Sequence, residues 1–371
     1  MPTIDELRLL QAQPLELKIM RTQARIREWV DRFGVDGVYI SFSGGKDSTV
    51  LLDIARKLYP NIKAVFANTG LEYPEIQSFV KQHENVDIIR PKMRFDEVIK
   101  TYGYPFISKD VAETVYYART VSSKWAWARL NGENGRGEPS KYRQSRFVKY
   151  KPLTQVDFNI SSRCCGIMKE KPLDDYNKDK SSITAIMADE SVRRKEAWLK
   201  TGCNAFNIGK SKPMSFWTEQ DVLKYIKDNG IQIASVYGEI VEDDDNQICI
   251  DGCGKKLKCT KCQRTGCIFC GYGAHHDKDG GGESRFVRLK HTHPKQYDYC
   301  MGGGEYNDDG ILEFDGAEIP EEERAEVIYA DGRFRLKNPR YDYMDDLDSL
   351  TASMEIIVGN TYDGIYRRNE Q

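Results

Sequence analysis

The stretch from Val38 to Leu52 constrains the fold of this 371-residue chain more than any other part of it. Residues 38–42 form an apolar run rich in β-formers, which is typical of a strand buried on both faces. Three small residues follow at positions 43–45, and small residues let backbone N–H groups come close to an anion. From position 50 onward, apolar residues recur at helical spacing. The stretch therefore predicts a strand, a glycine loop and a helix.

A phosphate is the ligand that such a loop suits. It would meet the N-terminus of the helix together with the Lys46 ammonium, which we expect to be exposed on the loop. Asp47 is a candidate Mg²⁺ ligand, and capping of the helix is an equally good interpretation of it. The plainer alternative for the loop is a strand-to-helix turn that happens to contain two glycines. The loop matches neither a Walker A motif nor a G-x-G-x-x-G fingerprint.

Ser-Gly-Gly-Lys-Asp-Ser at residues 43–48, directly after a hydrophobic strand, resembles the PP-loop of the ATP pyrophosphatase superfamily. Further segments resemble the PAPS-reductase branch of that superfamily. They are an Asn-Thr-Gly-Leu-Glu-Tyr-Pro-Glu segment, a substrate loop, a Cys-Cys stretch, a Glu-Ser-x-x-Arg turn and a Pro-x-x-x-Trp motif. In chain order these are residues 68–75, 104–109, 163–173, 188–194 and 213–226.

The resemblance implies a site for ATP or an adenylyl sulfonucleotide, with chemistry at the α-phosphate. It makes Lys46, Lys109 and Arg194 candidate catalytic residues, and Lys169 and Arg193 further candidate anion donors. Lys109, Lys169, Arg193 and Arg194 are equally well interpreted as surface cations. The nucleotide-binding residues that the resemblance implies are Ser41, Ser43, Gly44, Gly45, Lys46, Asp47, Ser48, Thr69 and Gly70.

Strand-like runs near residues 38, 64, 88 and 183 alternate with helical segments. This alternation indicates an α/β fold with a doubly wound, mostly parallel sheet, and the resemblance implies the adenine nucleotide α-hydrolase-like version of it. Ligands of such sheets bind at the carboxyl ends of the strands, beside a topological switch point. We predict a nucleotide-binding domain over residues 1–240 with an irregular substrate loop at about 104–157, a Cys-rich metal-binding module over 241–310 and an acidic C-terminal extension over 311–371.

Ten cysteines in a chain without a signal-peptide core favour metal ligands or redox groups over disulfides. Cys164 and Cys165 are adjacent, and Cys267 and Cys270 form a C-x-x-C pair. Adenylyl-sulfate reductases hold a [4Fe–4S] cluster with a Cys-Cys pair and a later C-x-x-C. The resemblance therefore implies a [4Fe–4S] cluster on these four residues, and four thiolates suit such a cluster.

The remaining close pairs allow more than one interpretation. Cys249, Cys253, Cys259 and Cys262 resemble a structural zinc site. A competing grouping joins Cys259, Cys262, Cys267 and Cys270 into one site, and it resembles the cluster segment of DNA-phosphorothioation proteins from the same superfamily. A third interpretation is that the cysteines are simply buried.

One departure from the family pattern bears on function. PAPS and adenylyl-sulfate reductases carry a catalytic cysteine in a Glu-Cys-Gly-[Ile/Leu]-His context, and these 371 residues contain no such segment; the last cysteine is Cys300. We therefore expect an ATP pyrophosphatase or adenylating enzyme linked to Fe–S-dependent sulfur transfer. The alternative is a PAPS or adenylyl-sulfate reductase that forms sulfite with a thiol from Cys300 or a partner. A second alternative is a regulatory module that binds nucleotide without turnover.

The formal net charge of −2 provides no global field toward nucleic acid or anionic lipid. A local basic region is a candidate contact for a nucleic-acid acceptor, or simply a solvated face. Its cations are Arg129, Arg136, Lys141, Arg143, Arg146, Lys149 and Lys151. The other expected partners are an adenine nucleotide and a sulfur donor or thiol partner protein. No segment approaches 18 uninterrupted apolar residues, so we predict no membrane span and a cytoplasmic location.

Overall fold

The computed structural model describes residues 2–134, 136–139, 147–155, 159–243, 255–268, 270–272 and 285–294, and short strands beyond them. The chain divides into two compact units. The first unit comprises residues Met1–Pro91 and Lys169–Gly266, and the second comprises Lys92–Met168 and Cys267–Gln371. The domain boundaries predicted from the sequence stay a prediction.

The first unit is built on a six-stranded sheet with the order β3-β2-β1-β5-β7-β6. Every neighbouring pair is parallel except β6 with β7 at one edge. The strands are β1 (Val38–Ser41), β2 (Ala64–Ala67), β3 (Val86–Ile89), β5 (Ser181–Ile183), β6 (Asn204–Ala205) and β7 (Lys210–Ser211). The predicted mostly parallel α/β sheet is confirmed, and the four expected strand positions correspond to β1, β2, β3 and β5.

The strand order reverses at β1. From β1 the chain moves outward through β2 to β3, and it then returns to the other side of β1 as β5, which pairs Tyr39 with Ser182. In open α/β sheets, ligands bind in the crevice at the carboxyl ends of the strands beside such a reversal. The turn that follows β1 is therefore the position in this unit at which the fold itself favours a ligand.

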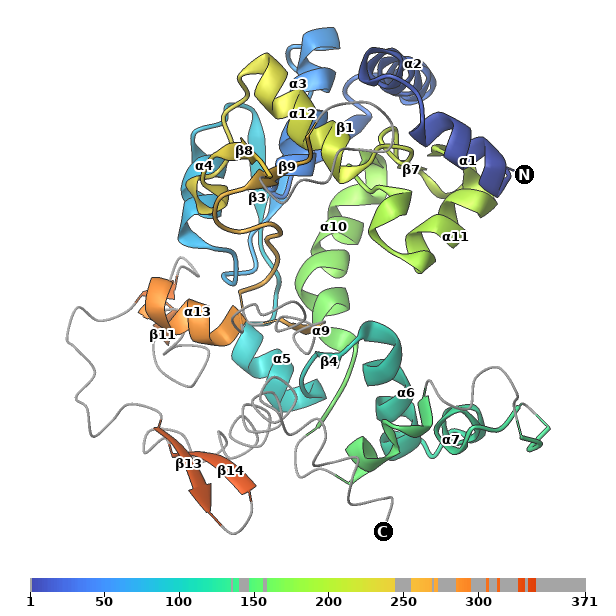
Figure 1. Cartoon of the computed structure of the whole chain (residues 1–371), viewed down its shortest axis with the longest axis vertical. Coiled ribbons are helices and arrows are strands. Elements are labelled where there is room, and N and C mark those ends of the chain that lie inside the picture. The colour runs from blue at the N-terminus through green and yellow to red at the C-terminus, as the bar shows by residue number, and fades with distance from the viewer. Residues whose placement is uncertain are drawn as a thin grey trace. The chain divides into compact units, whose positions relative to one another are not determined.

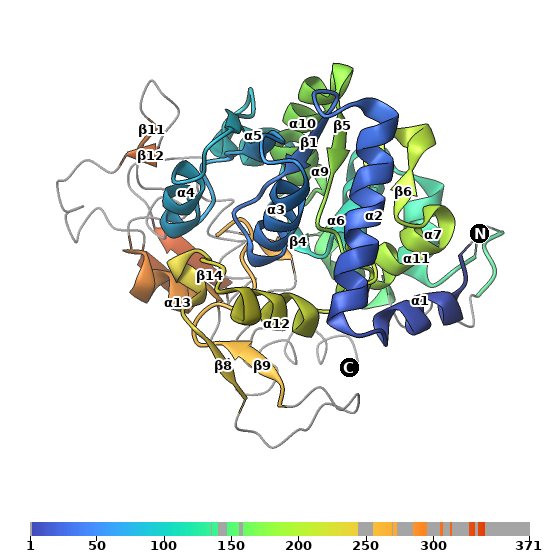
Figure 2. The ribbon, with the colours of Figure 1, turned by 90° about the horizontal axis from the view of Figure 1, so that it is seen from above.

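Both faces of β1 are covered by helices, as the alternation of its side chains requires. Val38 and Ile40 are fully buried in the apolar cluster that also contains residues of α2 (Leu15–Phe33), α3 (Lys46–Leu58) and α12 (Glu219–Asn229). Tyr39 points to the opposite face, where its ring meets Tyr176 of α10 (Lys171–Tyr176) edge to face at 5.1 Å. Figure 2 shows α2, α3 and α12 together on one side of β1 and β5. The sheet is thus doubly wound, as predicted.

Helix α2 begins directly after Pro14, which is its N-cap residue. Its first turn tolerates a preceding proline because the first N–H groups of a helix have no intrahelical partner. The other elements of this unit are α1 (Ile4–Gln11), α4 (Pro74–Lys81), η3 (Asn177–Asp179), η4 (Ala188–Glu190), α11 (Val192–Thr201), η5 (Phe206–Ile208), η6 (Ser235–Tyr237), β8 (Ile240–Glu242) and β9 (Leu257–Cys259).

The second unit is mainly helical where it is described (Figure 1). Its elements are α5 (Phe95–Tyr102), β4 (Phe106–Ile107), α6 (Lys109–Thr120), α7 (Lys124–Asn131), η1 (Lys151–Thr154), α9 (Arg163–Cys165), β10 (Gly271–Tyr272), α13 (Arg285–Thr292), β11 (Glu305–Tyr306), β12 (Leu312–Glu313), β13 (Glu326–Ala330) and β14 (Arg333–Lys337). A π-helical segment, η2 (Gly166–Glu170), joins it to the first unit. Strands β13 and β14 pair antiparallel.

Within this unit, β10 pairs in parallel with β4, which brings residues 271–272 beside residues 106–107. Ile107 has a φ of 61°, a left-handed conformation that β-branched residues rarely adopt. It lies in the segment that resembles the family's substrate loop, and local strain of this kind concentrates at functional sites.

No helix in the described part of the chain combines the length and the apolar character that crossing a membrane requires.

Candidate functional site

The predicted phosphate loop connects β1 to α3 in the first unit. Gly45 is the N-cap residue of α3 and Lys46 is its first helical residue, so Asp47 does not cap the helix. Gly44 has a φ of 70°, and a Cβ on it would lie 2.8 Å from side-chain atoms of both Ile76 and Val80 on α4. The loop therefore needs a glycine at position 44 for two reasons, its left-handed backbone and its packing against α4.

Hydroxyl groups hold the loop in shape. The Ser48 hydroxyl donates to the Gly45 carbonyl at 2.9 Å and accepts from the Ser43 N–H at 3.2 Å. The Ser43 and Ser48 hydroxyl oxygens lie 3.0 Å apart. These bonds organise a compact turn at the carboxyl end of β1, next to the reversal of strand order.

Lys46 does not lie exposed on the loop, and that expectation was wrong. Its side chain is 4% exposed, and its Nζ lies 2.9 Å from the Glu219 carboxylate and donates to the Gln263 carbonyl at 2.8 Å. The position at the first turn of α3 was correct, but tertiary contacts enclose the side chain. A buried ammonium requires such partners because an unpaired buried charge is strongly unfavourable.

Tyr237 covers the start of α3. Its hydroxyl accepts from the Lys46 N–H at 3.3 Å and lies 2.5 Å from the Thr265 hydroxyl, and its ring lies 5.8 Å from the Lys46 Nζ. Burial raises the pKa of Tyr237 well above its usual value, and the hydrogen bonds to Thr265 and Lys46 oppose that shift. The tyrosine therefore remains neutral and serves as a hydrogen-bonding cap on the helix N-terminus.

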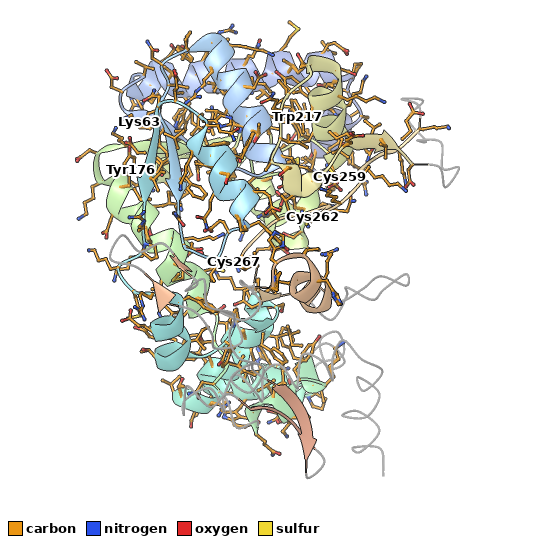
Figure 3. All side chains as sticks on the ribbon, turned by 90° about the vertical axis from the view of Figure 1, so that its left-hand side faces the viewer. Lys63, Tyr176, Trp217, Cys259, Cys262 and Cys267 are labelled. Atoms are coloured by element: carbon orange, nitrogen blue, oxygen red, sulfur yellow. The ribbon has the colours of Figure 1, made fainter. Side chains whose placement is uncertain are left out.

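A segment far along the chain passes over the loop, and we call residues 259–265 the strap. It follows β9, which pairs antiparallel with β8, and its backbone N–H at Cys262 donates to the Val236 carbonyl at 3.1 Å. The Gln263 side chain bonds both the N–H and the carbonyl of Cys259. Figure 3 labels Cys259 and Cys262 in this part of the unit. The strap thus holds the Gln263 carbonyl against Lys46.

A cavity of about 190 Å³ lies beside Lys46. Two cations, four carboxylates and one methionine line it. The cations are Lys46 and Arg264, and the other lining residues are Asp47, Asp189, Glu190, Glu219 and Met187. One Asp47 oxygen, Oδ1, is buried without a hydrogen-bond partner in the described structure. Burial raises the pKa of Asp47, and the Lys46 ammonium partly opposes this. The cavity is large enough for a phosphate or sulfate group and smaller than the pockets that enclose whole ligands.

Arg194 reaches the same region from α11, which follows β5. Its guanidinium forms an ion pair with Glu190, whose carboxylate also accepts from Arg264 at 3.1 Å. Burial and the neighbouring Arg264 lower the pKa of Arg194. Arg194 therefore follows β5, and the Ser43–Ser48 loop follows β1, on the two sides of the strand reversal.

Thr69 and Gly70 follow β2 and end at the same edge of the sheet. Glu72 is buried and accepts from the Thr69 N–H at 3.0 Å and the Thr69 hydroxyl at 2.8 Å, and the Lys169 Nζ lies 3.6 Å from it. Gly70 N–H donates to the Asn68 side chain at 2.9 Å. These bonds fix a tight turn in which the Asn68 side chain acts as an acceptor.

Lys109 belongs to the second unit, where it begins α6 after Ser108, whose hydroxyl accepts from the Val111 N–H at 3.2 Å. The four cysteines of the expected cluster also belong to this unit. Cys270 N–H donates to the Cys267 carbonyl at 3.1 Å, so one tight turn holds both.

Three of these cysteines lie close enough to Tyr272 to act on it electrostatically. Burial raises the pKa of Tyr272, and Cys165, Cys270 and Cys164 raise it further through their charges. In the described residues, no three His, Cys, Asp or Glu side chains are arranged to hold a single metal ion. A cluster core is larger than a single ion, so it would hold thiolates further apart than a single ion does.

The expected zinc residues fall into two halves. Cys249 and Cys253 lie outside the described residues. Cys259 and Cys262 are buried in the apolar cluster of the first unit, and the Cys262 thiol donates to the Arg264 carbonyl at 2.8 Å. Burial raises the pKa of Cys259. The zinc site stays a prediction.

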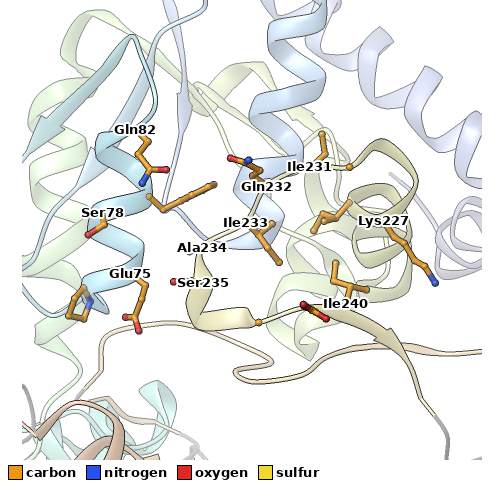
Figure 4. A pocket seen from close by; sticks show the side chains of 16 residues that line it. Glu75, Ser78, Gln82, Lys227, Ile231, Gln232, Ile233, Ala234, Ser235 and Ile240 are labelled. Carbon is orange, nitrogen blue, oxygen red and sulfur yellow. The ribbon is translucent and has the colours of Figure 1, made fainter.

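A second groove, of about 740 Å³, lies between α4 and the turn that follows α12 (Figure 4). Glu75, Gln82 and Lys227 supply polar groups along it, and Ile231 and Ile233 supply apolar ones. It contains none of the residues expected to bind nucleotide.

The basic region is only partly described, since Lys141, Arg143 and Arg146 lie outside the described residues. Arg129 donates to both carboxylate oxygens of Asp110, at 2.9 and 3.0 Å, and lies 3.8 Å from the centre of the Phe147 ring. This bidentate pair and ring contact give Arg129 a structural role.

Sequence reasoning missed Glu219, Tyr237, Gln263 and Arg264 as parts of the site. Gln263 and Arg264 lie among the cysteines, and that setting led to a metal-module interpretation of the whole segment. Glu219 and Tyr237 carry no local pattern that marks them, because long-range packing alone brings them to Lys46.

The model of the phosphoadenosine phosphosulfate reductase domain family matches residues 37–108 and 109–271 of this chain. The chain belongs to this family. The match spans the Ser43–Ser48 loop, the strap and all four cysteines of the expected cluster.

Curated relatives agree with this assignment. An adenosine 5'-phosphosulfate reductase from Mycolicibacterium smegmatis is 25% identical over 233 residues, which cover 62% of this chain and 78% of the relative. One from Oceanobacillus iheyensis is 24% identical over 216 residues, or 56% and 69% of the two chains. Among solved structures, a phosphoadenylyl-sulfate reductase from Candida auris in a phosphate complex aligns with 63% of this chain and 91% of its own length. The two are 17% identical, and the TM-score is 0.33.

Proposed function

We propose that the chain is a sulfonucleotide reductase that binds adenosine 5'-phosphosulfate over the Ser43–Ser48 loop and releases sulfite and AMP. The observation that carries the proposal is the position of the Lys46 ammonium at the first turn of α3, beside the strand reversal and a cavity of about 190 Å³. The family and the named activity of the relatives support the choice of substrate.

In the proposed reaction the chain's own residues bind and orient the anionic groups. The α3 N-terminus and Lys46 would bind one of them, and Arg194 of α11 and Arg264 of the strap would bind another. Lys109 stays a candidate cation that rests on the sequence alone. A thiolate attacks the sulfate sulfur, the bond from sulfur to the bridging oxygen breaks, and AMP leaves with the electron pair. A second thiol attacks the resulting S-sulfonate, which releases sulfite and leaves a disulfide.

A second candidate function is supported by the missing motif for the catalytic cysteine. The 371 residues contain no Glu-Cys-Gly-[Ile/Leu]-His segment, and Cys300 lies outside the described residues. The proposed sources of the thiol are Cys300 and a thiol partner protein. The second candidate is an ATP pyrophosphatase that adenylates an acceptor and serves Fe–S-dependent sulfur transfer. In that candidate the acceptor is a small metabolite or a nucleic acid, the latter through the basic region.

The products separate these functions. The full chain is incubated with adenosine 5'-phosphosulfate and a dithiol, and separately with ATP, and sulfite and pyrophosphate are measured. We expect sulfite and AMP from the first incubation, and loss of both in Lys46→Ala but not in the matched control Lys63→Ala, which removes an exposed ion pair with Asp87. Pyrophosphate without sulfite would establish the second candidate. Nucleotide binding with neither product would identify a regulatory module.

We also propose that Cys164, Cys165, Cys267 and Cys270 hold a [4Fe–4S] cluster. All four lie in one compact unit, three of them act on the same Tyr272 side chain, and thiolates are the ligands that such clusters take. When bound, the cluster would supply redox-active iron and a local charge. The zinc site, Mg²⁺ at Asp47 and the cytoplasmic location are further proposals that rest on the sequence alone.

A further inference from the structure

We propose that Glu219 is the internal counter-ion that an anionic ligand displaces from Lys46, and that it thereby lowers the affinity of the site for anions. The inference deepens the proposed function and rests on it only for the identity of the nucleotide. It starts from the ion pair of 2.9 Å between the Lys46 Nζ and the Glu219 carboxylate.

The two partners differ sharply in burial. Lys46 is 4% exposed and Glu219 is 47% exposed. A buried ammonium must keep an anionic or carbonyl partner, whereas a half-exposed carboxylate loses little when it returns to water. When a ligand oxygen replaces Glu219, the released carboxylate is therefore readily solvated by water. Lys46 has an anionic partner both before and after the exchange.

The backbone that carries Glu219 is fixed, so the exchange involves the side chain alone. Thr218 caps α12 with its hydroxyl on the Asp221 N–H, and Asp221 accepts from the buried Lys18 at 2.7 Å. The neighbouring Gln220 exchanges two hydrogen bonds with the backbone of Leu257, at 2.7 and 3.0 Å. Glu219 can leave Lys46 by rotation about its own side-chain bonds, without movement of the helix.

The cavity beside Lys46 makes the exchange necessary for a ligand. Four of its lining residues are carboxylates, and of these only Glu219 contacts Lys46 in the described structure. Glu190 is instead bound by Arg194 and Arg264. A single phosphate oxygen competes with Glu219 for Lys46, whereas a ligand with two linked anionic groups can contact Lys46 and the guanidinium groups of Arg194 or Arg264 together. Displacement of Glu219 therefore weakens the binding of every anion at Lys46, and a ligand with linked anionic groups offsets this cost through its second contact.

The test measures the affinities of inorganic pyrophosphate and AMP for the full chain by calorimetry, in wild type, Glu219→Gln and Glu16→Gln. The amide keeps the shape and an acceptor oxygen but removes the charge, so Glu219→Gln should bind both probes about tenfold more tightly, a factor equivalent to about 1.4 kcal/mol. Glu16 is exposed on α2, outside the cavity, and its variant changes the net charge equally. That control should match wild type.

The sign of the change separates exchange from a purely structural role. If Glu219 serves only to hold Lys46 in place, its loss weakens binding or leaves it unchanged, and either result overturns the proposal. Binding of neither probe by any of the proteins also overturns it. Tighter pyrophosphate binding by Glu219→Gln without binding of AMP or adenosine 5'-phosphosulfate would refute the proposed function and leave the exchange standing. Glu219→Ala, expected to act in the same direction, replaces the glutamine variant if thermal unfolding shows that variant to be misfolded.

Discussion

The ion pair between Lys18 and Asp221 provides the sharpest test of how the first unit holds its nucleotide loop. It joins α2 to the N-terminus of α12 at 2.7 Å, and the two side chains are 2% and 13% exposed. Lys18→Met keeps most of the aliphatic stem and removes the charge. Asp221 then remains largely buried without its cation.

The expected loss of stability depends on the hydrogen bonds that Asp221 keeps after Lys18 is replaced. Breaking a buried pair costs about 3–5 kcal/mol, because the remaining charge is uncompensated. Asp221 still accepts from the Thr218 N–H at 2.7 Å and the Thr218 hydroxyl at 2.9 Å, which favours the lower end, about 3 kcal/mol. For a unit of roughly 190 residues this corresponds to a fall of about 6–12 °C in Tm.

The assay is thermal unfolding followed by tryptophan fluorescence. Trp217 is a suitable reporter, since it is fully buried and its indole N–H donates to Thr22, one turn after Lys18 on α2. Lys63→Met is the matched control, because the Lys63–Asp87 pair at 3.1 Å has side chains that are 37% and 39% exposed. Exposed pairs contribute about 0–1 kcal/mol, so the control should lower Tm by at most about 4 °C.

The double variant K18M/D221N should be no less stable than Lys18→Met, because it removes the uncompensated charge as well. If Lys18→Met lowers Tm by no more than Lys63→Met, burial does not set the cost of this pair, and the reasoning is refuted.

Three further predictions concern the loop, its acid and the cysteines. Gly44→Ala should lower the free energy of unfolding of the first unit by about 2–5 kcal/mol in urea, because alanine adds left-handed strain and overpacks against α4. Gly230 has a φ of 59° and open space around it, so Gly230→Ala should show the cost of the strain alone. Equal losses of stability in the two variants would show that packing against α4 adds nothing. Burial raises the pKa of Asp47, so the folded state binds the proton more tightly than the unfolded state does. This group therefore lowers the stability of the fold as the pH rises from the ordinary pKa of 3.8 through the raised pKa of the folded state. Asp47→Asn should be more stable than wild type at neutral pH and its stability should depend less on pH, and a less stable variant would contradict this. Anaerobic protein should be brown with about four irons per chain, and Cys164→Ser should bleach it while Cys262→Ser should not; the reverse result would favour the grouping of Cys262 with the later cysteines.

The central sheet was predictable because its pattern is local. The apolar runs that became β1 and β2 and the stripe that became α2 can each be recognised within a few turns of chain. The position of the phosphate loop follows from them, since parallel strands that alternate with helices place their carboxyl ends on one edge.

The partners of the loop were not predictable in the same way. Glu219 and Gln263 lie 173 and 217 positions beyond Lys46 in the chain, and a composition rich in cysteine surrounds Gln263. The expectation that Lys46 is exposed failed for this reason. Local sequence placed it at a helix start, while segments far away in sequence decided its burial.

The strap gives the cysteines of the first unit a consequence for the nucleotide loop. Cys259 and Cys262 are buried in the same apolar cluster as residues of β1 and α3, and Gln263 bridges the Cys259 backbone while its own carbonyl accepts from Lys46. A change in the ligation or packing of Cys259 would therefore shift a direct partner of Lys46. The Cys259–Cys262 pair and the Ser43–Ser48 loop are therefore connected through one hydrogen-bonded segment. Whatever binds the Cys259–Cys262 pair, its occupancy and the affinity for an anion at Lys46 are expected to be coupled, and by linkage the coupling acts equally in both directions.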